Sequence, residues 1–198
     1  MIAVDQIRTS LTGPLELHPG TPEDAAVAMV LAGDNDRLEV CFIRRAQRSG
    51  DRWSGHLAFP GGRPEPGDRH LRDTAEREAE EELGLTLRQA EHLGSLPAVP
   101  INGIGGGGQL SSFVYYLGPE NAPLVPDERE VAAAFWTPID GLMATDRRTS
   151  MPWRGLQFPG IRLGEDVLWG LTLRVWQLWC EQVGIDLDLR WPIPAHTR

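Results

Sequence analysis

Five glutamates are crowded between residues 76 and 82, in the stretch EREAEEE. If this stretch is a helix, each residue advances by about 100°, and Glu78, Glu81 and Glu82 share one narrow face. An apolar stripe runs beside that face and consists of Leu71, Ala75, Ala79 and Leu83. Glu82 lies at the edge of the stripe, where burial and a like charge one turn away both disfavour a carboxylate. The pattern therefore predicts a hard divalent cation, Mg²⁺ or Mn²⁺, held by these oxygens, with a solvated acidic helix face as the alternative.

The helix that positions the glutamates is expected at about 71–83, closed by the glycine that follows it. Its phase places Glu76 and Glu80 on the side opposite the cluster. Arg77 flanks Glu81 and is in position to orient its carboxylate.

The remaining elements follow from hydrophobic periodicity and turn residues. Strands are expected near 25–32, 37–45, 56–59, 90–99, 111–117 and 131–139, the first two as a hairpin. Helices are expected at 3–11, briefly after Pro138, and at 165–183, with a loop or short strand over 146–164. The pattern predicts a single α/β or α+β (α/β/α) sandwich with a mixed β-sheet between helices. Residues 1–24 would form an N-terminal helix and linker, 25–184 the domain, and 185–198 a C-terminal tail.

Composition narrows the class of protein. The 198 residues carry a net charge of −9 without a basic run, which argues against a nucleic-acid surface. No apolar run is long enough for a membrane span or a signal peptide, so a cytoplasmic protein is expected. The two cysteines, Cys41 and Cys180, are predicted to be buried free thiols. A homodimer is left open.

The glutamate-rich stretch and the turn before it resemble the signature box of the Nudix hydrolases. The second half of the box is matched by Arg77, Glu78, Ala79, Glu81, Glu82, Gly84 and Leu85. In the first half, Gly62 and Asp68 supply the expected residue types one place early, because Arg63 and Arg69 occupy the expected positions. The preceding AFPGG and the later PGIRLGEDVLWGLT at 159–172 are similar to the coenzyme A pyrophosphatase branch.

The resemblance implies a Nudix-like fold and divalent-metal-dependent hydrolysis of a pyrophosphate bond in a nucleoside diphosphate linked to another group. Coenzyme A or a related compound is the leading substrate, and Mg²⁺ or Mn²⁺ is the implied cofactor. The implied ligands are Glu78, Glu81, Glu82 and the carbonyl of Gly62, with Arg77 orienting the carboxylates.

Further residues are assigned by the same resemblance. Asp68 would hold the metal-binding groups in position without binding the metal itself. The general base is left between the helix glutamates, Glu130 and Glu128. Phosphate-binding candidates are Arg44, Arg45 and Arg52.

Other residues receive a structural interpretation first. His56 is expected to be structural, and the glycine-rich stretch 101–109 to be a loop near the mouth of the cleft. Trp53 or Trp136 could stack on a base, although core or interface packing is expected for most tryptophans.

The substrate is the least determined feature. The stretch DRWSGHLAFPGG (51–62) departs from the run that usually precedes AFPGG in the coenzyme A branch. Nucleotide sugars and dinucleoside polyphosphates therefore remain alternatives, as does a catalytically weak Nudix-fold module that only binds nucleotides.

Overall fold

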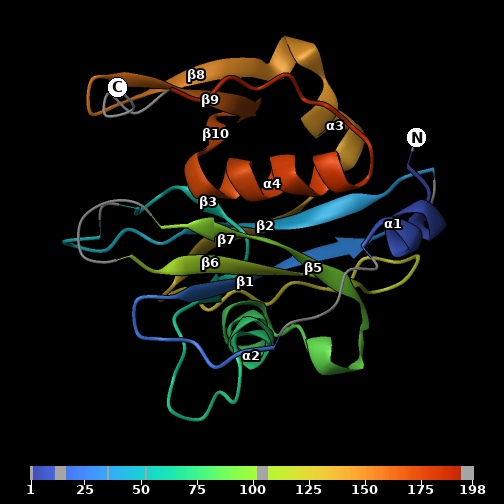
Figure 1. The fold of residues 1–198 in the computed structure, drawn as a ribbon, viewed down its shortest axis with the longest axis vertical. Helices are drawn as coiled ribbons and strands as arrows, with labels where there is room; N and C mark the ends of the chain where they lie inside the picture. The colour runs from blue at the N-terminus through green and yellow to red at the C-terminus, as the bar shows by residue number, and fades with distance from the viewer. Residues whose placement is uncertain (1, 12–16, 35, 52, 102–106, 193–198) are drawn as a thin grey trace.

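The computed structural model describes residues 2–11, 17–34, 36–51, 53–101 and 107–192, and its elements form stacked layers (Figure 1). The helices are α1 (Val4–Ser10), α2 (Leu71–Leu83), α3 (Ile139–Met143) and α4 (Gly170–Gln182), with 3₁₀ turns at Leu87–Gln89 and Thr145–Arg147. The strands are β1 (Ala25–Ala32), β2 (Glu39–Arg45), β3 (Leu57–Ala58), β4 (Gly61–Gly62), β5 (Glu91–Pro100), β6 (Gln109–Tyr116), β7 (Val131–Pro138), β8 (Arg148–Trp153), β9 (Leu156–Leu163) and β10 (Asp166–Trp169).

The central sheet is mixed. Its strand order is β3-β2-β1-β6-β5, with β4 paired to β1 and β7 paired to β2. Only the β1–β6 pairing is parallel among the described strands, and β1–β2 is the antiparallel hairpin that the sequence predicted. Helix α2 covers one face and α4 the other, which confirms the predicted sandwich (Figure 1).

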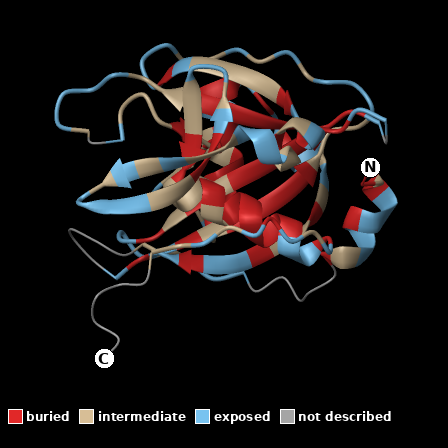
Figure 2. Cartoon of the chain, turned by 90° about the horizontal axis from the view of Figure 1, so that it is seen from above, coloured by how far each residue is buried: buried red, intermediate tan, exposed pale blue. Residues whose placement is uncertain are grey.

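Each face of the central sheet has its own apolar core. The buried residues gather in the interior of the molecule, and exposed residues lie around its edge (Figure 2). On one face Trp176 and Trp179 of α4 stack on each other, with ring centroids 4.8 Å apart, and are fully buried. On the other face the fully buried Ala75 and Ala79 of α2 pack in the same cluster as Ala26 of β1. Because these side chains are small, α2 approaches β1 closely, and this brings its glutamates to the turn that contains β4.

The C-terminal region differs from the sequence prediction. Residues 166–169, assigned to the last helix, instead form β10, which pairs with β9 in a second antiparallel sheet of three strands. The predicted helix start was wrong because Gly170, with φ of 63°, turns the chain from strand into helix only at that point. Stretch 146–164, expected as a loop or short strand, contains the hairpin β8–β9.

Several local predictions are confirmed. Helix α2 has the predicted bounds and ends at Gly84, which has φ of 69°. Cys41 and Cys180 are buried and free. Within the described residues no helix is long and apolar enough to cross a membrane. The proposed domain bounds stay a prediction, and most of the glycine-rich loop lies outside the described residues.

Candidate active site

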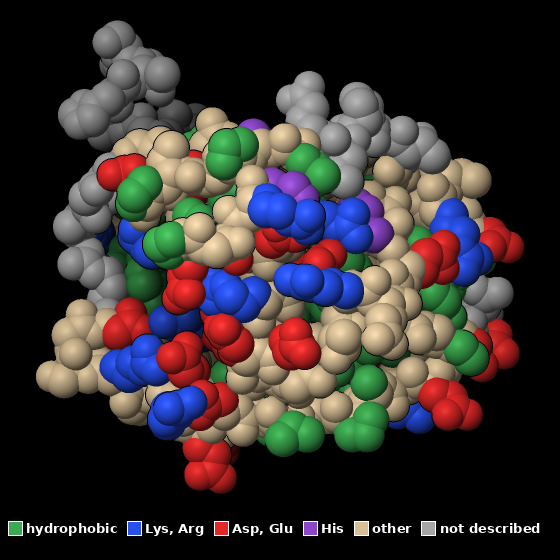
Figure 3. All heavy atoms as spheres, turned by 90° about the horizontal axis from the view of Figure 1, so that it is seen from below, with side chains coloured by type: hydrophobic (Ala, Val, Ile, Leu, Met, Phe, Trp, Pro, Cys, Tyr) green, Lys and Arg blue, Asp and Glu red, His purple; other side chains and the backbone are tan. Residues whose placement is uncertain are grey.

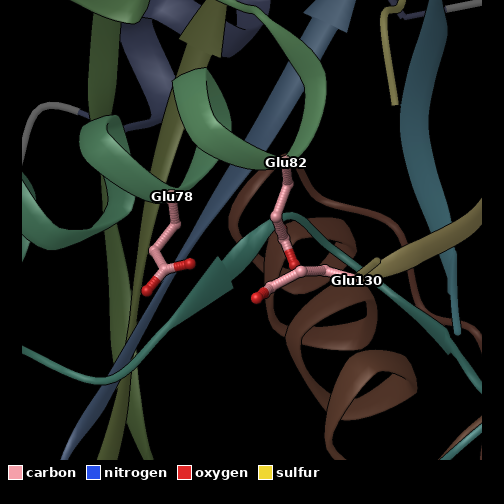
Figure 4. A group of neighbouring side chains, drawn as sticks. All are labelled: Glu78, Glu82 and Glu130. Carbon is pink, nitrogen blue, oxygen red and sulfur yellow. The ribbon is translucent and has the colours of Figure 1, made fainter. Parts of the chain in front are cut away.

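Three carboxylates converge at one place (Figure 4). Glu78 and Glu82 project from α2 one turn apart, and Glu130 comes from the turn before β7. One ligand oxygen from each lies within 4.8 Å of the others. Like charges at this separation repel, so the arrangement calls for protons or a cation between them.

Backbone hydrogen bonds place Glu130 in this cluster. The amides of Val125 and Asp127 donate to the carbonyls of Leu83 and Glu82, each at 3.0 Å, and so fasten residues 125–127 to the end of α2. The amide of Glu130 then donates to the Asp127 carbonyl at 2.9 Å. Arg48 holds the Glu130 carboxylate from outside through an Nη2–Oε1 contact of 2.9 Å.

Glu82 is the most deeply buried of the three and is 2% exposed. Burial raises its pKa to about 8, with a further contribution from the negative Glu78, although the Gly61 N–H donates to Oε2 at 2.9 Å and opposes the shift. Burial also raises the pKa of Glu78, against the effect of Arg77. A divalent cation would take the place of the protons that these carboxylates otherwise retain. The donor set, three carboxylates beside a backbone turn, therefore fits Mg²⁺ or Mn²⁺.

The Gly61–Gly62 turn fits against these carboxylates because it has no side chains. A Cβ on Gly62 would lie 2.2 Å from Oε1 of Glu78. A Cβ on Gly61, where φ is 155°, would lie 2.3 Å from the Ala26 carbonyl oxygen. Glycine is thus required at Gly61, where the clash is with backbone, whereas a side chain at Gly62 would displace the Glu78 carboxylate.

Arg77 ties the acidic groups of α2 to the loop before it. Its guanidinium contacts Asp68 at 3.2 Å, Glu78 at 3.1 Å and Glu81 at 2.7 Å, and also donates to the carbonyl of Arg63 at 3.0 Å. Although burial acts in the other direction, hydrogen bonds from Arg77 and the Glu65 amide lower the pKa of Asp68. The orienting role of Arg77 and the supporting role of Asp68 stay predictions, with which these contacts are compatible.

The structure separates Glu81 from the three clustered carboxylates. Its side chain is 57% exposed and pairs with Arg77. Its assignment as a metal ligand stays a prediction, while Glu130 is found in the place where a third carboxylate was expected.

Glu76 lies away from the cluster and is buried. It accepts a hydrogen bond from the Tyr115 hydroxyl at 2.9 Å and pairs with Arg72 at 2.8 Å. These two partners satisfy the carboxylate, so its burial needs no ligand. On the face of the molecule that Figure 3 shows, acidic and basic side chains are interspersed.

A cleft of about 440 Å³ opens over the carboxylate cluster. Besides Glu78, Glu82 and Glu130 it is lined by Ala25, Val27, Arg45, Trp53, His56, Leu57, Ala58, Phe59, Gly61, Gly62, Arg63, Leu110, Trp169, Gly170, Leu171 and Thr172. This volume is within the range of small-molecule sites.

The predicted phosphate-binding arginines occupy different places. Arg45 lines the cleft and pairs with Asp51 at 3.0 Å, while Arg44 lies within 3.6 Å of Asp166 and does not line it. Arg52 lies outside the described residues.

Sequence reasoning missed part of the wall of this cleft. His56, expected to be structural, lines it, as does Trp169. Reading residues 165–169 as helix concealed the position of Trp169, and only the second sheet reveals it. Trp136, the other stacking candidate, donates its Nε1–H to the Ala122 carbonyl at 3.1 Å and is not a lining residue.

Comparison with known proteins agrees with this geometry. The NUDIX domain family matches residues 22–154, about two thirds of the chain. The chain belongs to the Nudix family. The matched region includes α2, the Gly-Gly turn and Glu130, and it ends before β9, β10 and α4.

Two curated relatives are similar in sequence. An uncharacterised protein of Schizosaccharomyces pombe is 39% identical over 115 residues, covering 56% of this chain and 35% of its own. An uncharacterised Nudix hydrolase, NudL, of Yersinia pestis is 30% identical over 145 residues, covering 67% of this chain and 66% of its own. The chain thus spans about a third of the yeast relative and about two thirds of the Yersinia relative.

The fold also resembles a solved structure. A Nudix hydrolase from M. smegmatis, RenU, superposes with a TM-score of 0.51 at 21% identity, covering 64% of this chain and 81% of the other. At this level of identity the likeness concerns the fold.

Proposed function

We propose that the protein is a divalent-metal-dependent hydrolase of a pyrophosphate bond in a nucleoside diphosphate linked to another group. The observation that carries the proposal is the convergence of Glu78, Glu82 and Glu130 in a cleft of suitable size. The family match and the relatives described as Nudix hydrolases support it.

Glu78 and Glu82 would hold Mg²⁺ or Mn²⁺, with Glu81 and the carbonyl of Gly62 as further ligand candidates and Glu130 beside the metal as the base. When bound, the metal would neutralise phosphate charge and lower the pKa of attacking water. The Glu82 carboxylate is buried and accepts the Gly61 N–H, and both contacts restrict its movement.

Two residues act on the reactants from the sides of the cleft. Arg45 binds a phosphate oxygen, because its guanidinium lines the cleft and its Nε is buried without a partner among the described residues. Glu130 accepts the proton of the attacking water at a carboxylate oxygen. It is the exposed member of the cluster and Arg48 fixes its orientation, whereas Glu128, the other candidate in this segment, is outside the cluster.

For the substrate we favour coenzyme A or a related compound, on the likeness of the segments at 58–62 and 159–172 to that branch. Such a pocket must hold a 3′-phosphate with a cation outside α2, and since Arg45 is assigned to the reacting phosphate, Arg44 is the candidate for this role. Arg44 is 41% exposed beside Asp166, so it can exchange its weak 3.6 Å contact for a phosphate.

The test is a screen of nucleoside-diphosphate compounds with Mg²⁺ or Mn²⁺ that measures release of nucleotide or phosphate. Coenzyme A should exceed its 3′-dephospho form in kcat/KM by at least about tenfold, which corresponds to one weak charged contact of roughly 1.4 kcal/mol. Equal values, or faster turnover of a nucleotide sugar, would contradict the coenzyme A assignment. Absence of turnover on every compound, with nucleotides still bound, would contradict hydrolysis and favour a binding module.

A further inference from the structure

Three tryptophans from distant parts of the chain form one aromatic cluster beside the cleft. Trp53 stacks on Trp153, with centroids 5.5 Å apart and planes at 25°. Trp169 lies 5.4 Å from Trp153 and 6.3 Å from Trp53. The ring of His56 closes the group at 5.2 Å from Trp169 and 5.7 Å from Trp53.

Two features distinguish this cluster from ordinary core packing. Trp53 remains 43% exposed although it contacts three other rings, and it is one of the few large apolar side chains so exposed among the described residues. Trp53, His56 and Trp169 also line the same cleft as the carboxylates. An exposed indole that is stacked on a second indole inside a concave site offers a preformed flat surface to a ligand.

One ring of the cluster, that of Trp169, and part of the adjoining cleft wall come from the region that lies outside the family match. Trp169 ends β10 and Gly170, Leu171 and Thr172 begin α4, all beyond residue 154. Thr172 is fixed there, since its hydroxyl donates to the Leu57 carbonyl at 3.1 Å. The second sheet therefore contributes a wall that the matched domain does not supply.

We propose that Trp53, supported by Trp153 and Trp169, is a stacking platform for the nucleobase of the substrate, and that His56 contacts the edge of that base. The proposal deepens the proposed function, because it names the group that the second sheet recognises. A base has an apolar face and a polar edge, and the cluster matches both. The indole faces carry no charge, and the His56 ring makes no hydrogen bond within the described part of the chain, so its nitrogens are available to the base.

The experiment measures binding, so that it does not depend on turnover. Adenosine 5′-monophosphate and ribose 5-phosphate share a phosphate and a sugar and differ in the base. Each is titrated in excess Mg²⁺ into the wild-type protein, Trp53→Leu and Trp136→Phe, by calorimetry and by tryptophan fluorescence. Trp136 is the matched control, because it is a half-buried indole outside the cleft.

The nucleotide should quench the fluorescence of the wild type and bind about tenfold more tightly than ribose 5-phosphate, at the lower end of base–aromatic stacking. Trp53→Leu should lose the quenching and this tenfold advantage, and its affinity for ribose 5-phosphate should stay within about twofold of wild type. Trp136→Phe should bind both as the wild type does. Thermal melting confirms that each variant is folded, and Trp53→Phe, which keeps a smaller ring, should lie between wild type and Trp53→Leu.

Equal affinity of Trp53→Leu and wild type for the nucleotide would overturn the platform. The platform would also be overturned if Trp53→Leu lost affinity only for phosphopantetheine, titrated in the same way. The cluster would then hold the other arm of the substrate. Glu82→Gln, which removes activity, should keep the base-dependent quenching. The platform is thereby tested separately from the hydrolase. A protein that hydrolyses no diphosphate but shows this quenching would contradict the hydrolase and leave the platform intact.

Discussion

Glu82→Gln should stabilise the metal-free protein while it removes activity. The pKa of the Glu82 carboxylate rises from its ordinary 4.5 to about 8. The charged form is therefore disfavoured in the folded protein by roughly 5 kcal/mol relative to the unfolded chain. The unfolded chain releases this proton near 4.5 and the folded chain near 8. The folded protein therefore loses stability as pH rises through this window, and below it the effect is absent. Glutamine carries no charge, and its amide oxygen can still accept the Gly61 N–H.

The expected gain in unfolding free energy depends on pH. It is about 1 kcal/mol at pH 5 and grows to about 4 kcal/mol at pH 8, as upper limits, since neighbouring groups relax around the charge. Denaturant unfolding in the presence of a chelator measures this gain at each pH. With Mg²⁺ present the wild type should become the more stable of the two proteins, because it gains stability from the metal and the variant gains less.

Turnover of the same Glu82→Gln variant should fall by about a hundredfold or more, since charge that stabilises the bound metal is lost. Glu80→Gln is the control, because Glu80 is exposed on the opposite side of α2. It should stay within about twofold in activity and within about 0.5 kcal/mol in stability. Equal effects of the two substitutions, or a stability gain for Glu82→Gln that does not grow with pH, would refute this account of the site.

Two further predictions concern other residues of the carboxylate cluster and its turn. Gly62→Ala should lower kcat by about tenfold or more with little change in melting temperature, because the new methyl group displaces the flexible Glu78 carboxylate rather than backbone. A fully active variant would show that the close fit of the turn is unnecessary. Glu130→Gln should reduce kcat by at least about a hundredfold whereas Glu128→Gln stays near wild type, and similar losses in the two would contradict the assignment of Glu130 to the cluster.

The local sequence determined the helix that carries the glutamates. The apolar stripe at Ala75 and Ala79 and the glycine after Leu83 define both the buried face and the end of α2, and these are properties of adjacent residues. The periodicity of Glu78 and Glu82 likewise placed the carboxylates beside this face. The hairpin β1–β2 followed from alternation and a short polar turn.

Contacts between distant segments decided the rest. Glu130 lies beside Glu82 because the backbone of residues 125–127 hydrogen-bonds to the end of α2. No sequence pattern within the segment 127–130 predicts these hydrogen bonds. The same holds for the aromatic cluster, in which Trp53 and Trp169 meet only because β10 pairs with β9 instead of continuing the helix. Helical periodicity in residues 165–169 could not reveal that pairing, because the free energy of a strand in a sheet depends on its partner strand. Neighbouring residues therefore determine which groups carry the chemistry, and the tertiary structure determines which of them meet.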